Sequence, residues 1–325
     1  MRGGGAEMSE NILLSVIVPV YNVEKYLPAA LDSLLAAGAD VPLEILAADD
    51  GSSDGSPRIL EEYAEKDGRV RIIGAGGGGV SHVRNLCLAE AKGKYITFAD
   101  SDDTVEPGFF AEAVREMEEN GYDLVQGDAR FVAEDGQVLK TLPGCGRRAS
   151  ADPAELLEWF YGRDQALLFS VWGKVYRREI VADVRFPEGI RIAEDQRYLF
   201  DALKKHPKEL ILDTPAYNYA VRESSVMQAG YAEKGWDAIR VLEGIETEAG
   251  DPQIRRYIDK QKTDIWVRIY NTAKLNGKDT GKALEAIRAA DIREIRNELT
   301  KKERVKLVLL QHCPALYDIL LKTVG

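Results

Sequence analysis

The stretch "LLSVIVPVYNVEKYLPAALDSLLAAG", residues 13–38, decides the fold of the N-terminal part of the chain. Its first ten residues form an almost unbroken apolar run, which is typical of a β-strand buried on both faces of a sheet. The remainder carries apolar residues at helical spacing from Tyr26 to Leu35, and Gly38 marks the end of that helix. The stretch therefore predicts a buried strand followed by a helix that covers the sheet.

The same alternation of strand and helix occurs three more times before residue 122. The predicted strands are "LEILAADD", "RVRIIGA" and "KYITFAD", and the predicted helices that follow them are "SPRILEEYAEKDG", "VSHVRNLCLAEAKG" and "PGFFAEAVREMEENG". This order predicts an α/β fold, in which a mostly parallel, Rossmann-like sheet is flanked by helices.

The remaining sequence is less regular. "YDLVQGDARFVAEDGQVLKTL" predicts two strands around an Asp135-Gly136 turn, and the pattern is helical from about Ala232 onward. We expect three regions, namely a flexible leader at 1–10, the α/β domain at 11–230 and a C-terminal helical region at 231–325.

Composition and charge limit the function. The 325 residues carry a net charge of −11, which argues against nucleic-acid binding because that function needs a basic face. Three widely spaced cysteines indicate neither a disulfide framework nor a zinc site. Because the sequence shows neither a signal peptide nor an apolar run of about 18 residues, we expect a cytoplasmic protein.

The candidate site lies just after the predicted strands, because an open parallel sheet binds ligands beyond the carboxyl ends of its strands. An aromatic ring, carboxylates, hydroxyls and an arginine collect there, and together these groups suit a nucleotide. The candidate residues are Pro19, Tyr21, Asn22, Asp50, Arg84, Asp100 and Ser101.

Three carboxylates lie within four residues after the fourth strand. Asp100-Ser101-Asp102 is a D-x-D motif whose oxygen ligands suit Mn²⁺ or Mg²⁺, and such a metal would stabilise a diphosphate leaving group. The alternative is an acidic cap on the following helix, with Asp103 or Thr104 at the N-cap before Pro107.

The run "GAGGGG" from Gly74 to Gly79 satisfies the dinucleotide-binding pattern G-x-G-x-x-G. We reject that interpretation because the pattern belongs to the first βαβ unit, and here two strands precede it. Whether this loop contacts a donor phosphate stays open.

Four segments in order resemble glycosyltransferase family 2. They are "SVIVPVYNVEKYLPAALDSLLAAG", "LAADDGSSDGS", "VSHVRNLCLAEAKGKYITFADSDD" and "FPEGIRIAEDQRYLF", within residues 12–225. The resemblance implies a GT-A fold, a nucleotide-sugar donor and inversion of the anomeric centre. It also implies nucleobase contacts for Pro19, Tyr21 and Asp50, proximity of Arg84 to the nucleotide, a ribose contact for Asp100 and a metal on Asp102.

Glu194-Asp195 follows a Pro/Gly stretch and opens a predicted helix. The resemblance implies that Asp195 is the general base, which we expect Glu194 to support. An inverting transfer needs one carboxylate to take the proton of the acceptor hydroxyl. The alternative is that both acids only favour the positive end of the helix dipole.

Three weaker candidates lie elsewhere. Trp172 and Lys174 suit the acceptor side, although Trp172 is equally consistent with the core. Arg222 resembles a residue beside the donor phosphates, with a surface arginine as the alternative.

The C-terminal stretch "KKERVKLVLLQHCPALYDILLKTVG" combines basic and apolar residues. It suits a peripheral helix on the inner face of a membrane, or packing on the domain or in a homodimer.

Together these features predict transfer of a hexosyl or N-acetylhexosaminyl group from a UDP-sugar to a glycan or lipid-linked acceptor, for an envelope or capsular polysaccharide. Two alternatives are a nucleotidyltransferase on a similar sheet and a non-catalytic nucleotide-sugar-binding protein.

Overall fold

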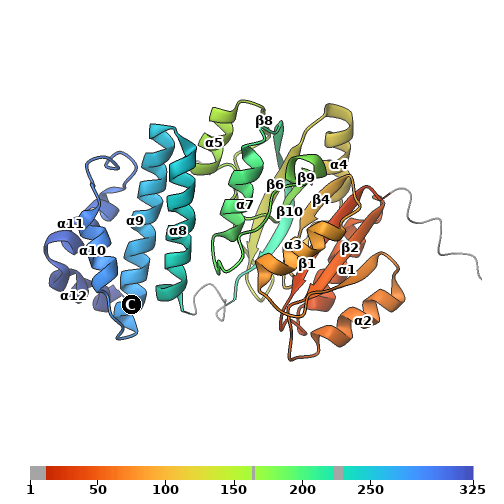
Figure 1. Ribbon diagram of the computed structural model, residues 1–325, viewed down its shortest axis with the longest axis horizontal. Helices are drawn as coiled ribbons and strands as arrows, with labels where there is room; N and C mark the ends of the chain where they lie inside the picture. Colours follow the sequence, from red (N-terminus) through yellow and green to blue (C-terminus); the bar gives the residue numbers. More distant parts are fainter. Residues whose placement is uncertain (1–11, 163–164, 223–229, 325) are drawn as a thin grey trace, which may run out of the picture. The chain divides into compact units, whose positions relative to one another are not determined.

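The computed structural model describes residues 12–162, 165–222 and 230–324 (Figure 1). The predicted leader, residues 1–10, lies outside them. Contacts divide the chain into two compact units, the first formed by residues 1–160, 164–189 and 195–223, and the second by residues 161–163, 190–194 and 224–325. The domain boundary predicted near residue 230 stays a proposal, because compactness alone does not show where independent folding begins.

The first unit contains a mixed sheet and the helices that cover it. Its strands are β1 (Leu14–Val20), β2 (Leu43–Asp49), β3 (Val70–Gly74), β4 (Tyr95–Phe98), β5 (Thr104–Val105), β6 (Leu124–Val132), β7 (Val138–Leu142), β8 (Arg148–Ser150), β9 (Lys174–Arg177) and β10 (Glu209–Ala220). Its helices are α1 (Leu27–Ala37), α2 (Ser56–Lys66), α3 (Val80–Glu90), α4 (Phe109–Asn120), α6 (Arg178–Val181), most of α5 (Pro153–Tyr161) and nearly all of α7 (Glu194–Leu203).

The strand order is β3-β2-β1-β4-β9-β6-β10-β5, with β7 beside β6 and β8 beside β10. The first four strands of this order are parallel, and β9 runs antiparallel between β4 and β6. The ends of β1, β2 and β4 therefore meet at one edge of the sheet, as the sequence predicted.

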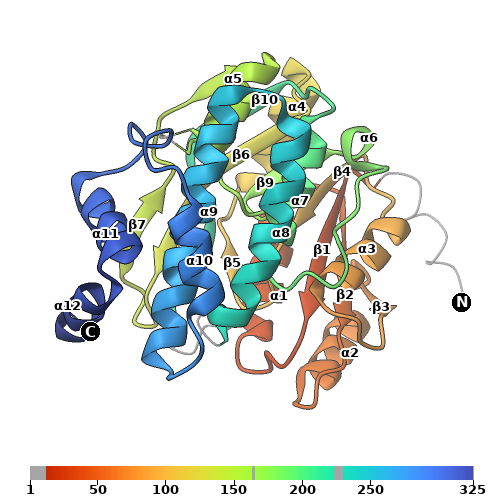
Figure 2. The same cartoon turned by 60° about the vertical axis from the view of Figure 1, so that its left-hand side comes forward.

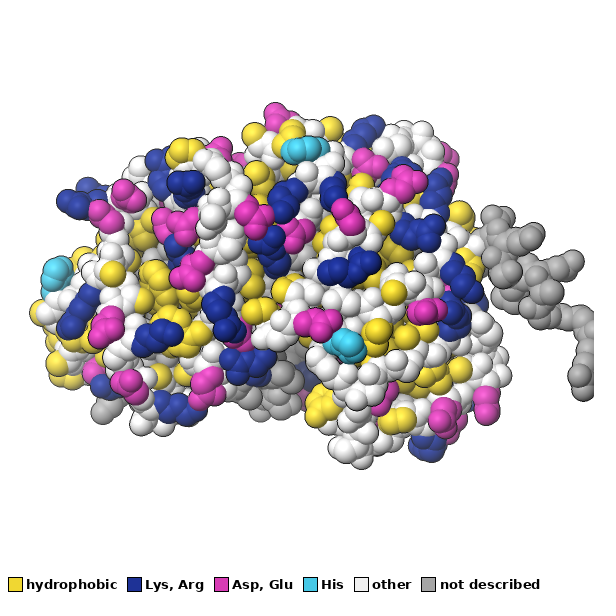
Figure 3. Space-filling model, in the orientation of Figure 1, with side chains coloured by type: hydrophobic (Ala, Val, Ile, Leu, Met, Phe, Trp, Pro, Cys, Tyr) yellow, Lys and Arg dark blue, Asp and Glu magenta, His cyan; other side chains and the backbone are white. Residues whose placement is uncertain are grey.

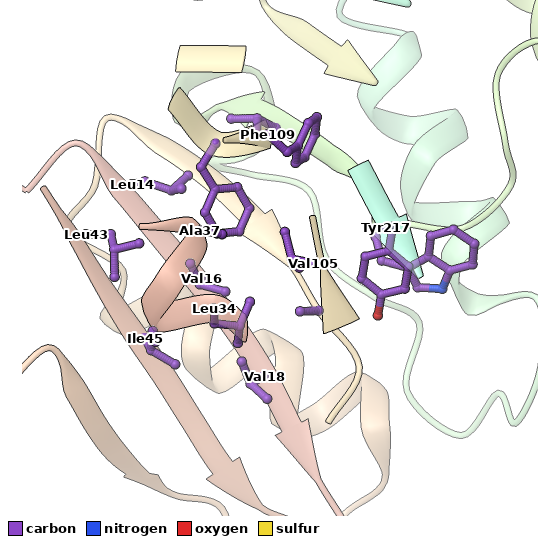
Figure 4. Close-up of a cluster of buried hydrophobic side chains, with 14 of the residues drawn as sticks. Leu14, Val16, Val18, Leu34, Ala37, Leu43, Ile45, Val105, Phe109 and Tyr217 are labelled. Carbon is purple, nitrogen blue, oxygen red and sulfur yellow. The ribbon is translucent and has the colours of Figure 1, made fainter. Parts of the chain in front are cut away.

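The main core lies between this sheet and α1 and α4 (Figure 4). Alternate residues Leu14, Val16 and Val18 of β1 point to this face, and Leu34 of α1 packs over them. The uninterrupted apolar run of β1 is explained by its second face, where Ile17 is also fully buried.

Helices α3 and α7 cover the opposite face of the sheet. The Cys87 thiol of α3 contacts the Leu46 carbonyl oxygen of β2 at 3.6 Å. The ring of Phe98 in β4 meets that of Tyr198 in α7 edge-on, with 5.4 Å between centroids. Both helices therefore pack against the face of the sheet opposite the main core.

The predicted alternation of strands and helices is confirmed through α4, and so are the β6–β7 hairpin and the helical C-terminal region. The two-residue strand β5 follows the D-x-D motif closely in sequence and pairs with β10. This strand was not predicted. It is too short to leave a periodic pattern in the sequence.

The second unit is helical where it is described. It contains α8 (Tyr231–Ala249), α9 (Pro252–Leu275), α10 (Gly281–Ala289), α11 (Lys301–His312) and α12 (Pro314–Val324). Figures 1 and 2 both show α8 lying along α9. Thr300 and Glu303 form a capping box that starts α11. None of the helices in the described ranges is both long and apolar enough to cross a bilayer.

Candidate active site

The end of β1 begins the candidate site. Pro19 is buried opposite Ala48 in the parallel ladder, whereas the Tyr21 side chain is 58% exposed. Asn22 adopts a left-handed conformation, with φ of 50°, and its Oδ1 accepts the Ser53 backbone N–H at 2.8 Å. The Tyr21 ring is thus open to a ligand, while the Asn22 side chain ties the end of β1 to the loop after β2.

The loop "DDGSSDGS" after β2 uses two of its acids to hold its own shape. Asp49 accepts the backbone N–H of Ser52 at 3.1 Å, and Asp54 accepts that of Ser56 at 3.0 Å. These are local Asx contacts that stabilise the turn. Asp49 and Asp54 are therefore engaged by the loop itself, which leaves Asp50 as the acid for other contacts.

Asp50 meets the glycine run. Its Oδ1 accepts the Gly79 backbone N–H at 2.9 Å, at the start of α3. Residues 76–79 all have positive φ, between 67° and 125°, a conformation that only glycine adopts without strain. The run follows β3 at the sheet edge instead of β1, which agrees with the rejection of a dinucleotide fingerprint.

Arg84 of α3 links two carboxylates from distant parts of the sequence. Its Nη2 donates to Asp100 Oδ1 at 2.9 Å, and its Nη1 donates to Asp195 Oδ1 at 2.6 Å. The guanidinium is almost fully buried and lies 5.1 Å from the Phe186 ring centroid. A buried cation between two acids joins the predicted donor side to the predicted base.

The charge state of Asp100 reflects this environment. Burial raises its pKa to about 6, the Arg84 cation opposes the rise, and the carboxylates of Asp195 and Asp102 add to it. Its side chain keeps 30% exposure, so a ligand can reach it. The Arg84 cation thus favours the ionised form of Asp100, the form that accepts hydrogen bonds from a ribose hydroxyl.

Asp102 has a different partner. The Arg222 guanidinium, just beyond β10, donates to Asp102 Oδ2 and to the Asp102 backbone carbonyl. It also lies 3.9 Å from the centroid of the Tyr26 ring. The Asp102 side chain is 38% exposed, so the expected metal ligand faces solvent with a cation already beside it.

The third acid, Asp103, is structural. It is buried, and its Oδ1 accepts the Ala220 backbone N–H of β10 at 2.8 Å. Burial raises the pKa of Asp103 to about 8, and the carboxylates of Asp100 and Asp102 add to that rise. Helix α4 starts from Gly108, without a side-chain cap, so the acidic-cap alternative is wrong.

Three further residues that were predicted for the site are buried. Ser101 is 5% exposed. Trp172 belongs to the core cluster, where it stacks on Tyr217 with 4.5 Å between ring centroids. Lys174 has no exposed surface, and its Nζ donates to the Ser170 carbonyl oxygen at 2.6 Å. The core alternative therefore describes Trp172 better, and Lys174 shares that environment.

Tyr217 of β10 was missed from the sequence. Its hydroxyl oxygen accepts the Asp100 backbone N–H at 2.9 Å, so this residue fixes the loop that carries the D-x-D motif. The alternation of Tyr217 and Tyr219 with other residues marked a strand, but not which loop the ring would reach.

Asp195 lies in the first turn of α7. Its Oδ2 accepts the Val171 backbone N–H at 3.2 Å, and its side chain is 20% exposed. Asp195 thus pairs with the Arg84 cation and keeps part of its surface exposed, an arrangement that suits the carboxylate of a general base. Glu194 begins α7 and groups with the second unit. Its supporting role stays a prediction.

A metal site built from protein side chains alone is absent from the described part of the chain, which has no suitable group of three or more His, Cys, Asp or Glu residues. A Mn²⁺ or Mg²⁺ ion that shares a diphosphate needs only one or two protein carboxylates. Asp102 fits that requirement, because it is partly exposed and its carboxylate already attracts a cation, the Arg222 guanidinium.

A mostly parallel sheet with helices on both faces and carboxylates at its strand ends is an arrangement of the GT-A type. The family model described as "Glycosyl transferase family 2" matches residues 15–185. The chain belongs to this family, which confirms the resemblance.

Curated relatives agree with this assignment. Putative glycosyltransferase EpsH of Bacillus subtilis is 34% identical over 263 residues, which are 79% of this chain and 74% of EpsH. Uncharacterized glycosyltransferase EpsJ of the same organism is 32% identical over 221 residues, 67% of this chain and 64% of EpsJ. The chain spans only 33% of glycosyltransferase GlyA of Streptococcus pneumoniae, at 30% identity and with 70% of this chain covered.

Solved structures confirm the fold. Staphylococcus aureus TarS 1–349, in complex with UDP-GlcNAc, matches with a TM-score of 0.64 and 24% identity over 95% of this chain and 89% of TarS 1–349. Mannosyltransferase PcManGT from Pyrobaculum calidifontis, in complex with GDP-Man and Mn²⁺, matches with a TM-score of 0.57 and 16% identity. The match covers 97% of this chain and 87% of PcManGT.

Proposed function

We propose that the protein is a metal-dependent inverting glycosyltransferase. It transfers a hexosyl or N-acetylhexosaminyl group from a UDP-sugar to a hydroxyl group of a glycan or lipid-linked acceptor. The observation that carries the proposal is the Arg84 bridge, which holds Asp100 and Asp195 on one cation although 95 positions of sequence separate them. Family membership and the TarS complex with UDP-GlcNAc support the donor class.

The donor side would use the ends of β1, β2 and β4. The exposed Tyr21 ring stacks on the nucleobase beside Pro19, while Asp50 accepts a base N–H. Asp100 would accept from a ribose hydroxyl. Asp102 would hold Mn²⁺ or Mg²⁺, and such an ion would supply positive charge for the departing diphosphate. Asp50 would have to share or give up the Gly79 N–H, which links donor binding to the glycine run.

The transfer step is a single displacement at the anomeric carbon. The acceptor oxygen forms the new C–O bond as the bond to the diphosphate oxygen breaks, and UDP leaves with both bonding electrons. Asp195 takes the proton of the acceptor hydroxyl. Arg84 keeps the Asp195 carboxylate ionised and oriented before the acceptor arrives.

Arg222 would change partners during the cycle. In the free protein its guanidinium pairs with Asp102, the predicted metal ligand. An ion held by Asp102 would compete with this guanidinium, and Arg222 would then be free to pair with the diphosphate oxygens. The phosphate contact of Arg222 stays a prediction, and the exchange of partners is an addition that the sequence did not indicate.

The biological setting rests on the relatives. Poly(ribitol-phosphate) beta-N-acetylglucosaminyltransferase TarS of Staphylococcus aureus is 29% identical over 70% of this chain and 39% of TarS. Minor teichoic acid biosynthesis protein GgaB of Bacillus subtilis is 30% identical over 71% of this chain and 25% of GgaB. We therefore propose an acceptor of envelope or capsular polysaccharide synthesis at the cytoplasmic face of the membrane.

The test is incubation with a panel of nucleotide-sugars, Mn²⁺ and candidate acceptors, with detection of free nucleoside diphosphate. A glycosyltransferase releases UDP from one donor, and EDTA stops the release. A nucleotidyltransferase given a sugar phosphate and UTP would release pyrophosphate instead. Donor binding without turnover across the panel would favour the non-catalytic binding protein.

A further inference from the structure

Helices α11 and α12 carry an apolar face that is exposed among the described residues. Five side chains form this face, which we call the apolar tail face: Val305, Val308, Leu316, Ile319 and Leu320. Their exposed fractions range from 47% to 62%. Spacings of three and four residues place them on one side of each helix.

The other sides of the two helices are used for packing. Leu307 and Leu310 of α11 and Tyr317 of α12 are buried in the core of the second unit. The Tyr317 hydroxyl donates to Asn271 Oδ1 of α9 at 3.0 Å. The helices are thus fixed by one face, and the apolar tail face is not required to hold them in place.

The concentration of exposed apolar residues is unusual for this chain. Eleven large apolar side chains are exposed in the described residues, and five of them belong to these two short helices. Single exposed apolar residues are ordinary, whereas a group of them marks a contact surface.

The segment that carries the apolar tail face has a net charge of opposite sign to that of the whole chain. Residues 301–325 carry five basic and two acidic side chains, whereas the chain has a net charge of −11. Lys301 and Lys302, at the start of α11, are both exposed. Figure 3 shows hydrophobic atoms at the surface near α11 and α12, with both Lys or Arg and Asp or Glu side chains beside them.

The charge decides between two occupants of this surface. A second copy in a two-fold dimer would bring the same face against itself, so that lysines would approach lysines. A bilayer with anionic headgroups offers apolar depth for the valines, leucines and isoleucine, together with negative charge for the lysines. We propose that the apolar tail face docks on the surface of an anionic bilayer.

The strength of this docking follows from two additive contributions. Each lysine near an anionic surface contributes about fivefold in partitioning, and the apolar side chains add to this by burial at the headgroup boundary. Docking would keep the protein at the surface where a lipid-linked acceptor lies. The docking proposal itself does not depend on the proposed transfer reaction.

The experiment is flotation of the full-length protein with vesicles of phosphatidylcholine that contain about 30% phosphatidylglycerol, compared with phosphatidylcholine alone. We expect binding to the anionic vesicles, weaker binding to the neutral ones, and a loss of binding as salt is raised. Equal binding to both vesicle types, or none to either, would overturn the proposal.

Matched variants separate the two contributions. Lys301→Glu/Lys302→Glu should weaken partitioning by about 25-fold or more, since each lysine contributes about fivefold. Ile319→Ser/Leu320→Ser should weaken it about tenfold, on the basis of lost apolar burial. The controls are Lys92→Glu/Lys140→Glu, exposed lysines of the first unit, and Leu275→Ser, which has the same 62% exposure as Ile319.

Circular dichroism and UDP affinity should be unchanged in all of these variants, which shows that they fold. Sedimentation of the wild-type protein without lipid measures its oligomeric state and tests the alternative occupant, a second copy of the chain. A dimer that Ile319→Ser/Leu320→Ser dissociates would assign the apolar tail face to a second copy and contradict membrane docking.

Discussion

Two groups of charged side chains in the first unit differ in how their charges are balanced. Around Arg84, carboxylates accept hydrogen bonds from a guanidinium and keep part of their surface exposed. Lys174 and Glu209, at the starts of β9 and β10, are instead fully buried, and Glu209 has no hydrogen-bond partner for either carboxylate oxygen among the described residues.

The electrostatic consequences differ accordingly. Burial lowers the pKa of Lys174 to about 7 and raises that of Glu209 to about 8, and the opposite charge of each opposes the other's shift. At the Arg84 group, hydrogen bonds compensate the charges while a ligand can still reach them. Burial without access indicates a structural group, whereas compensated charge with access indicates a place for chemistry.

The largest effect in this comparison is expected at Asp102. Asp102→Ala should abolish metal-dependent binding of UDP, because it removes the one protein carboxylate proposed to hold the ion. Calorimetry with UDP and Mn²⁺ measures this. Asp213→Ala, at an exposed acid within β10, is the control and should bind as the wild type does. Unchanged affinity in Asp102→Ala would mean that the D-x-D motif holds no metal.

Arg222→Ala should have two opposite effects. Removal of the guanidinium frees Asp102, so Mn²⁺ alone should bind about tenfold more tightly or better, since a charged hydrogen bond of about 1.5–3 kcal/mol corresponds to at least about tenfold. UDP with Mn²⁺ should bind more weakly, because a cation is lost from the diphosphate.

The control for Arg222 is Arg69→Ala, which breaks a comparable ion pair with Asp67 remote from the D-x-D motif in sequence. Electron paramagnetic resonance of free Mn²⁺ reports the first effect without nucleotide. If Arg222→Ala leaves Mn²⁺ affinity unchanged, the proposed exchange of partners is wrong.

The Lys174 pair should affect stability and not chemistry. Lys174→Met removes the hydrogen bond from Nζ to the Ser170 carbonyl oxygen and should lower the free energy of unfolding by about 1–3 kcal/mol. Lys174→Met/Glu209→Leu also removes a buried acid that has no hydrogen-bond partner among the described residues, and should recover part of that loss. Urea unfolding measures both variants. Turnover per folded molecule should stay within about twofold of wild type, and a larger loss would return Lys174 to the acceptor side.

The pH dependence of the free energy of unfolding also tests whether Glu209 is a buried structural group. Between about pH 4.5 and 8, folded Glu209 holds a proton that the unfolded chain releases, so stability should fall as pH rises through this range. Glu209→Gln removes this titration, and its stability should fall less between pH 5 and 7 than that of wild type. Parallel curves for the two proteins would contradict the proton uptake assigned to Glu209.

Much of the first unit could be predicted from the sequence, because buried parallel strands leave continuous apolar runs and their helices leave periodic stripes. The same logic predicted which loops meet at the sheet edge, and so brought Tyr21, Asp50 and Asp100 into one candidate site.

The partners of the acids could not be predicted in this way. Asp100, Asp102 and Asp103 are nearly adjacent, yet they pair with Arg84, Arg222 and the Ala220 backbone respectively. Those pairings depend on where distant segments pack, which no local pattern records. The complete burial of Lys174 was not predicted for the same reason, since a lysine two residues after Trp172 in sequence gives no sign of it.

The central claim is that the carboxylate held by Arg84 is the base of a transfer reaction. Turnover of Asp195→Asn at saturating donor, together with a UDP titration of the same protein, tests it most directly. The amide preserves shape but cannot take a proton, so turnover should fall by roughly 10²- to 10⁴-fold while the Kd for UDP barely changes. Turnover above about a tenth of wild type, with the fold intact, would contradict the account and direct the search for the base to Glu194.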